Sequence, residues 1–446
     1  METSGMQLGD SSRVAVVGGG PAGSLVSYFL LDLAERVGLS IDIDIYERRD
    51  FSVPGPTGCN MCGGIVSESL VQMLATEGIN LPPTVVQRSI DSYVLHSDVG
   101  TVYISTPLQE MRIAAVHRGS GPKGALGTRW GSFDGYLLEL AQEKGAHLIR
   151  GRVEEINWNH SRPQVCAKDR PPQSYDLLIG AVGVNSPSLK LFEGLGFRYQ
   201  PPETTRTFIA EFHLGLEAIK EQFGASMHVF LLNMPRIEFA ALIPKGEYVT
   251  MCLLGDEINR GLVDAFLSNP VVRGCLPWEL ASVGPACQCS PRINVKGGYR
   301  LFGDRVVLIG DSGITRLYKD GIGAAYRAAK AVAVTAIFDG VSGRDFHRHY
   351  WPACQVIARD NQFGKLVFMV VSIIRRLRFL RRGVLRMAEK EQLKEAKERD
   401  MSMVLWDTFT GSAPYRNIFW RASQPAFLLR LGLEAGKTLA SFKLRG

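Results

Sequence analysis

Near the start of the chain, the pattern of apolar and polar residues changes from that of a strand to that of a helix and back, which predicts a strand, a helix and a second strand. The apolar run at 13–17 has the length of a short buried strand, and the glycines after it lead into an apolar helix at about 21–37. Residues 41–47 alternate Ile and Asp and end in Tyr-Glu, which is typical of a strand. This order predicts a βαβ unit with a right-handed crossover.

The pattern after this unit predicts more strands, further helices and a separate sheet. Between 207 and 254 the apolar runs have strand length and are separated by turn residues, so we expect a sheet there. Strands that alternate with helices favour an α/β fold. The other expected elements are strands at 153–156, 176–180 and 305–309 and helices at 134–144 and from 321 onward.

Length and composition exclude several classes of protein. The 446 residues suggest two or three lobes, and 46% hydrophobic with 21% charged residues excludes disorder as the dominant state. Eight irregularly spaced cysteines do not form the pattern of a secreted disulfide framework. Neither a signal peptide nor an apolar stretch of about 20 residues is evident, so we expect a cytoplasmic protein without a conventional transmembrane helix.

The glycine turn after the first strand has the spacing G-x-G-x-x-G of a dinucleotide site, and Ala22 lies inside it. Gly18 permits the tight turn, Gly20 lets the backbone approach a pyrophosphate, and Gly23 lets the helix pack closely on the strand. The start of the helix offers free N–H groups to phosphates. Glu47 ends the second strand, where it can accept hydrogen bonds from an adenosine ribose.

A second glycine site separates FAD from NAD. The strand at 305–309 is followed by Gly-Asp, and the carboxylate of Asp311 can hold ribityl hydroxyls. Gly321, Ile322 and Gly323 then open a helix whose positive end would face the pyrimidine edge of a flavin. We therefore expect FAD, with Arg48 and Val153 as further cofactor contacts.

With these motifs the chain resembles the flavoprotein superfamily of the aromatic hydroxylases, and within it the geranylgeranyl reductase family. The family resemblance rests on Cys62-Gly-Gly-Ile and on Arg129 with the Phe-Asp pair at 133–134. It implies a Rossmann-like FAD-binding domain, Cys62 as a catalytic candidate on the active-site face, and Arg129 as a flavin contact. The chain departs from the superfamily at Val182, and it has Ala241 and Ile243 where the family usually has aromatic residues.

The cysteines and histidines leave two interpretations open and predict no metal site. Cys59 and Cys62 form a C-x-x-C pair, which is either a redox dithiol or two small residues in a cofactor-facing loop. Zinc would need a second pair, and Cys287 with Cys289 has a poor spacing for it. The eight histidines are scattered along the chain and indicate no metal site.

The chain has a net charge of +7, and its excess of Lys and Arg lies after residue 360. An apolar run at 366–374 is too short to span a bilayer. It is followed by a basic, apolar segment, so 366–386 is either a peripheral membrane contact or a helix packed across the domain interface. Nucleic acid is not expected, because no binding module accompanies the basic residues. The arginines are Arg375, Arg376, Arg378, Arg381, Arg382 and Arg386.

The resemblance and the motifs together predict an FAD-dependent oxidoreductase that reduces double bonds of an isoprenoid or similar apolar substrate. A flavin-dependent hydroxylase and a flavin-binding protein without turnover are the alternatives. The electron donor is NAD(P)H or a protein. The expected domains are an FAD-binding domain at 13–80, 121–190 and 295–340, a β-sheet substrate domain at 81–120 and 191–294, and a helical C-terminal region at 341–446.

Overall fold

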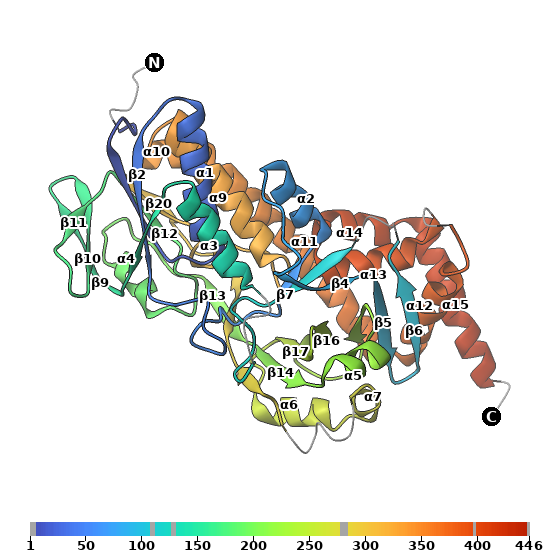
Figure 1. Cartoon of the computed structure of the whole chain (residues 1–446). Coiled ribbons are helices and arrows are strands. Elements are labelled where there is room, and N and C mark those ends of the chain that lie inside the picture. The colour runs from blue at the N-terminus through green and yellow to red at the C-terminus, as the bar shows by residue number, and fades with distance from the viewer. Residues whose placement is uncertain (1–5, 108–111, 126–130, 277–283, 396–397, 444–446) are drawn as a thin grey trace.

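The computed structural model describes residues 6–107, 112–125, 131–276, 284–395 and 398–443. Within them, a six-stranded sheet has the order β20-β21-β12-β1-β2-β8, and its strands from β21 to β8 are parallel (Figure 1). The strands are β1 (Ser12–Val17), β2 (Ile41–Glu47), β8 (His147–Arg150), β12 (Leu177–Gly180), β20 (Phe302–Gly303) and β21 (Val306–Leu308).

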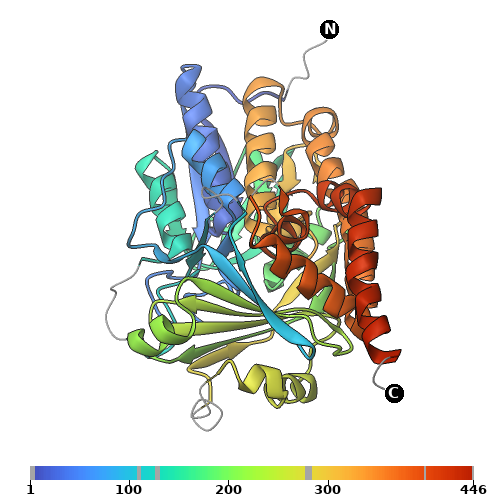
Figure 2. The same ribbon diagram turned by 90° about the vertical axis from the view of Figure 1, so that its right-hand side faces the viewer.

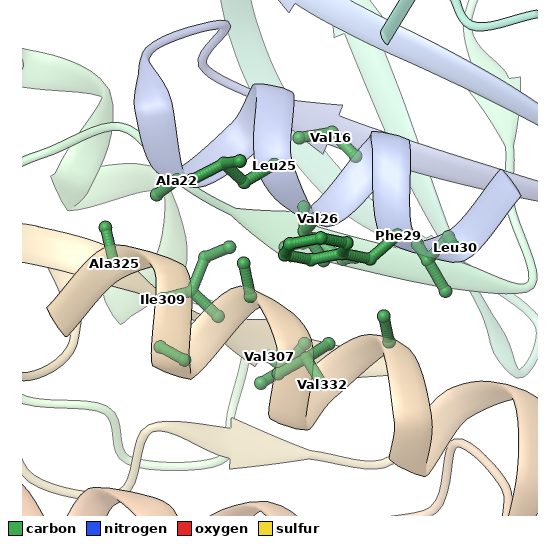
Figure 3. Close-up of a cluster of buried hydrophobic side chains, with 14 of the residues drawn as sticks. Val16, Ala22, Leu25, Val26, Phe29, Leu30, Val307, Ile309, Ala325 and Val332 are labelled. Carbon is green, nitrogen blue, oxygen red and sulfur yellow. The ribbon is translucent and has the colours of Figure 1, made fainter. Parts of the chain in front are cut away.

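Three helices lie beside this sheet: α1 (Pro21–Arg36), α3 (Phe133–Glu143) and α9 (Gly321–Phe338). Figure 3 shows α1 and α9 packed through Val26, Phe29 and Val332, all of which are fully buried. In the described part of the chain, α9 is the one helix long and apolar enough to cross a bilayer. Because it packs on α1, it serves here as a core helix.

Strand β2 has the expected alternation of Ile and Asp, but its central part is buried on both faces. Ile43 and Ile45 are fully buried, but Asp44 is buried as well. The Asp44 carboxylate pairs with Arg13 at 3.0 Å and accepts a hydrogen bond from the hydroxyl of Tyr175 at 2.7 Å. A central strand of a parallel sheet is covered on both sides, so a polar residue there needs such partners.

A second sheet of seven strands, here called the roof sheet, has the order β18-β14-β17-β16-β15-β5-β6 in the described residues. Figure 2 shows it beneath the six-stranded sheet and its helices. Short helices α5 (Leu216–Gln222), α6 (Arg260–Leu267) and α7 (Pro270–Arg273) accompany it. Its strands are β5 (Ser92–Ser97), β6 (Gly100–Ser105), β14 (Phe208–His213), β15 (Ser226–Phe230), β16 (Ile237–Lys245), β17 (Tyr248–Gly255) and β18 (Cys287–Cys289).

Smaller strands and two helices complete the part of the chain before residue 297. They are β3 (Ile65–Val66), β4 (Val86–Ile90) and β7 (Ile113–Val116), β9 (Val153–Asn159), β10 (Arg162–Ala167) and β11 (Gln173–Ser174), β13 (Glu203–Arg206) and β19 (Arg292–Lys296), and the helices α2 (Glu68–Thr76) and α4 (Lys190–Glu193).

The C-terminal region is helical, as expected, and packs against the roof sheet (Figure 1). Arg375 pairs with Glu238 of β16 at 2.8 Å, and Arg381 pairs with Asp98 beside β5 at 2.7 Å. These two arginines are buried, so this part of 366–386 packs against the protein, which was one of the two expected alternatives. The helices are α10 (Gly343–Asp345), α11 (Trp351–Arg376), α12 (Arg378–Glu391), α13 (Asp400–Thr410), α14 (Tyr415–Ala422) and α15 (Pro425–Lys443).

Two buried histidines predict how stability depends on pH. Burial lowers the pKa of His96 to about 4 and that of His228 to about 3. An unfolded histidine has a pKa of about 6.5, so below that pH the unfolded chain binds protons that the folded chain excludes. The free energy of unfolding should therefore fall as the pH drops from about 6.5 towards 4, by up to about 1.4 kcal/mol per pH unit for each histidine.

Urea unfolding at a series of pH values measures this slope. His228→Asn should reduce it, whereas replacing the exposed His160 with Asn should leave it unchanged. A slope that is the same in all three proteins would contradict the assignment.

Candidate active site

A cavity of about 320 Å³ lies between the carboxyl ends of the parallel strands and the roof sheet. Its wall includes Gly20 after β1, Glu47 at the end of β2, and Asp311 after β21. Because β21 and β2 are three strand positions apart, these ends are separated by roughly 14 Å. The cavity is therefore suited to an elongated ligand that crosses the strand ends.

The glycines of the turn after β1 have two different roles: one faces the cavity, and the others are required because the backbone packs closely around them. Gly18 has a positive φ of 107°, and a Cβ there would overlap the carbonyl oxygen of Ala181. A Cβ at Gly23 would overlap the carbonyl oxygen of Gly18. Gly20 instead faces the cavity, with only the amide of Asn60 near a Cβ, at 3.2 Å. Gly20 and Ala22 thus line the cavity, whereas Gly23 lets α1 approach β1.

The backbone fixes the carboxylate of Glu47 at the cavity wall. Its Oε2 accepts a hydrogen bond from the N–H of Gly19 at 2.9 Å, and its Oε1 accepts one from the N–H of Arg49 at 2.8 Å. This positions the group to accept further hydrogen bonds from a ribose. Arg48 and Val153 also line the cavity. Arg129 lies outside the described residues.

Asp311 follows a glycine that the packing of α1 requires. Gly310 has a φ of 60°, and a Cβ there would lie 2.8 Å from that of Ala22. The Asp311 side chain is accessible through the cavity. Surrounding protein atoms desolvate its carboxylate and raise its pKa, and the positive charge of Arg118 partly offsets that increase. A carboxylate in this place favours hydrogen-bond donors, such as hydroxyl groups, in a bound molecule.

The N-terminus of α9 also reaches the cavity, through Gly321 and Ile322. Asp320 precedes the helix with a left-handed backbone, but its carboxylate pairs with Arg316 and Arg327 and does not cap the helix. The first N–H groups of α9 are therefore not capped by this side chain. A Cβ at Gly323 would overlap the Asp320 carboxylate, so Gly323 is needed for packing.

One buried polar atom shows that this wall suits a hydrogen-bonding ligand. Asn294 lines the cavity and is 4% exposed. Its Nδ2 donates to the carbonyl oxygen of Asp311 at 3.0 Å, but its buried Oδ1 has no hydrogen-bond partner. Such an atom costs free energy unless a ligand donates to it. The ring N–H of a flavin is a suitable donor, so the residues present fit FAD.

Cys62 lies in the cavity wall beside Gly63, next to the roof sheet. A Cβ at Gly63 would lie 3.4 Å from the sulfur of Cys252 on β17. Cys59 instead lines a smaller adjoining pocket, and burial raises the pKa of its thiol. Only Cys62 of the C-x-x-C pair therefore faces the main cavity.

Sequence reasoning missed several cavity residues. Lys319 is 8% exposed, and its Nζ lies 2.8 Å from the centre of the Phe239 ring. Burial lowers its pKa well below the usual value. Arg118 forms a buried pair with Asp134, and Phe409 reaches the cavity from α13. Lys319 lies two residues before Gly321 of the second glycine site, and this position is the local signal that could have identified it.

A search of protein-family models found no match. The chain is 23% identical over 388 residues to geranylgeranyl diphosphate reductase of Synechocystis sp., covering 82% of this chain and 84% of that protein. A geranylgeranyl bacteriochlorophyll reductase-like protein of Thermoplasma acidophilum superposes with a TM-score of 0.65 at 12% identity, covering 93% of this chain and 98% of the other. A variant of halogenase PltM in complex with FAD gives 0.60 at 13% identity, covering 97% of each chain.

The fold is that of an FAD-dependent oxidoreductase. The expected fold class and the resemblance to a geranylgeranyl reductase are thereby confirmed. In this flavoprotein fold the two predicted glycine sites, Glu47 and Asp311 line one cavity. The assignment of individual residues to parts of FAD stays a prediction.

The two kinds of glycine predict different consequences of substitution. Gly20→Val should leave the flavoprotein folded but abolish FAD binding, because the new side chain enters the cavity. Gly23→Ala should lower the free energy of unfolding by about 1–3 kcal/mol, because its Cβ overlaps the backbone of the turn. Gly9→Val, at a site with open space, is the control.

Flavin absorbance per protein and thermal unfolding separate the two effects. Stoichiometric FAD bound by the Gly20→Val variant with unchanged affinity would show that the pyrophosphate does not lie over this turn.

Proposed function

We propose that this flavoprotein reduces carbon–carbon double bonds of an isoprenoid or similarly apolar substrate. The observation that carries the proposal is an apolar chamber in the part of the cavity that the roof sheet lines. Its wall is formed by side chains of four strands and of α13. They are Ile209, Met227, Phe239, Ile243, Cys252, Leu254 and Phe409.

The chemistry of the chamber wall supports an apolar substrate. Phe239 and Ile243 of β16 and Cys252 of β17 bring it carbon and sulfur surface. Ile243 stands where the geranylgeranyl reductases usually have an aromatic residue, so this wall is aliphatic at that point. Burial of a methylene group against such a surface contributes about 0.8 kcal/mol, which suits a chain of many methylene and methyl groups.

When bound, FAD supplies two-electron transfer. Saturation of a double bond also requires a proton, and the protein must hold its donor beside the substrate. Lys319 and Cys62 line the cavity and carry exchangeable protons. Lys319 contacts the Phe239 ring, so its amine lies at the wall of the apolar chamber.

The alternative is a monooxygenase-type reaction, because the halogenase PltM shares the fold. The chamber can hold an apolar substrate for either reaction. The two hypotheses differ in whether oxygen is consumed and in what happens to the substrate.

Anaerobic reduction of the holoprotein distinguishes them. We expect geranylgeranyl diphosphate, added without oxygen, to restore the oxidised absorbance spectrum and to give a product with fewer double bonds by mass spectrometry. Met227→Trp should reduce this rate at least tenfold while leaving the FAD content unchanged, because the indole fills the chamber. A hydroxylated product that forms only with oxygen would instead support the monooxygenase.

We propose further that the flavoprotein takes an apolar substrate from a membrane surface through α11. The second half of this helix carries an exposed apolar stripe at spacings of three and four residues. Arg376 and Arg378 are exposed at its end, where they can contact anionic lipid headgroups. The stripe consists of Leu366, Met369, Val370, Ile373 and Leu377.

Binding to vesicles that contain anionic lipid tests this surface. Arg376→Gln with Arg378→Gln should weaken binding by up to about 30-fold, since each arginine contributes up to about 1 kcal/mol. Met369→Asn with Ile373→Asn should remove the component of vesicle binding that persists at high salt, because that component comes from buried apolar surface. Val356→Asn is the control, because Val356 is exposed on α11 but lies about 20 Å away along the helix.

Arg375 and Arg381 are left unchanged, since they hold the helices to the roof sheet. A wild-type protein that stays in the supernatant at low salt would contradict the membrane contact and would leave the reductase proposal to its own test.

A further inference from the structure

We propose that His96, His228 and Cys275 bind one zinc ion on the outer face of the roof sheet. Among the described residues, they are the one group of three histidine, cysteine or acidic side chains whose ligand atoms all lie within 4.8 Å of one another. Nε2 of His96 lies 3.1 Å from Nδ1 of His228 and 3.5 Å from the sulfur of Cys275. No local pattern predicts this site, because the three residues are far apart along the chain.

The register of the roof sheet brings the two histidines together. His96 pairs with Phe230 across the parallel strands β5 and β15, and His228 lies two residues before Phe230 on the same face. Met227 and Val229 point to the other face, where Met227 lines the cavity. The proposed zinc site is therefore separated from the FAD cavity by the sheet.

Cys275 reaches the histidines from the segment that covers this face. It lies two residues after the end of α7, and its thiol donates to the carbonyl oxygen of Val271 at 3.3 Å. A zinc ion would join this covering segment to β5 and β15. The site would thus act as a structural clamp on the outside of the roof.

The distances agree with tetrahedral zinc. Zinc binds nitrogen at about 2.0–2.1 Å and sulfur at about 2.3 Å, so neighbouring ligands are about 3.3 Å apart for two nitrogens and about 3.6 Å for nitrogen and sulfur. The observed 3.1 and 3.5 Å are close to these values. The sulfur is also 3.7 Å from Nδ1 of His96, so the imidazole must turn slightly to direct Nε2 at a shared ion.

Thr101 supplies the outer contact that a zinc-binding histidine requires. Its hydroxyl lies 3.2 Å from Nδ1 of His96. When Nδ1 donates its proton to that hydroxyl, Nε2 keeps a lone pair for zinc. Zinc binding then removes the proton of the Cys275 thiol, while the neutral His228 keeps its proton on Nε2. One proton is released, and a water molecule completes the four ligands.

The competing explanation is a metal-free cluster in which the same three side chains are held by hydrogen bonds alone.

Cobalt(II) substitution of the metal-stripped, FAD-loaded protein decides between them. We expect one Co²⁺ per chain, the intense near-ultraviolet absorption of a cobalt–thiolate bond, and displacement by Zn²⁺. Cys275→Ser and His228→Asn should lose this absorption. Thr101→Val should weaken binding about 10- to 100-fold. Cys166→Ser, on the distant strand β10, should behave as the wild type.

Retained flavin absorbance in each variant shows that the fold is intact. No cobalt–thiolate absorption in the wild type, or equal absorption in the wild type and the Cys275→Ser variant, would overturn the proposal. Neither result bears on the reductase activity, because the sheet separates the two sites.

Discussion

The close approach of α1 and α9 at the ends of the parallel strands is the constraint on which the cofactor site depends. Gly310 leaves no room for a side chain beside Ala22, and Gly23 leaves none beside the glycine turn. Fully buried residues such as Phe29 and Val332 hold the two helices together (Figure 3). Because both helices begin at the cavity, this packing fixes where their positive N-terminal ends point.

The roof sheet and the C-terminal helices turn this cofactor groove into an enclosed site. Met227 and Phe239 bring apolar surface from the sheet, and Phe409 adds a wall from α13. The buried pairs made by Arg375 and Arg381 fasten the helical region to the sheet. The helical C-terminal region therefore closes the chamber through α13 and presents an apolar stripe to solvent on α11, which is why we connect substrate access with α11.

Local features of the sequence identified residues that the structure brings to one cavity. The glycine spacing, the strand ending in Glu47 and the Gly-Asp turn each specify a backbone conformation within a few residues, so they can be recognised without the fold. The α/β class followed from the same pattern. The helical tail was also expected, and the burial of Arg375 and Arg381 agrees with one of the two alternatives for its basic segment.

Features that depend on distant pairing could not be predicted. Lys319 becomes a chamber residue only because β16 places Phe239 above it. The two histidines of the proposed zinc site meet only through the pairing of β5 with β15, since 132 residues separate His96 from His228. The partners of a buried polar side chain are set by register between strands, and no local pattern encodes that register.

The central claim is that one cavity holds FAD from the adenosine end at Glu47 to the flavin end at Asp311. Equilibrium titration of the flavin-free protein with FAD and with FMN tests it most directly. FAD should bind at one equivalent and at least about 100-fold more tightly than FMN, a difference of about 2.7 kcal/mol, because FMN leaves the adenosine end empty. Equal affinities for the two flavins would contradict the claim.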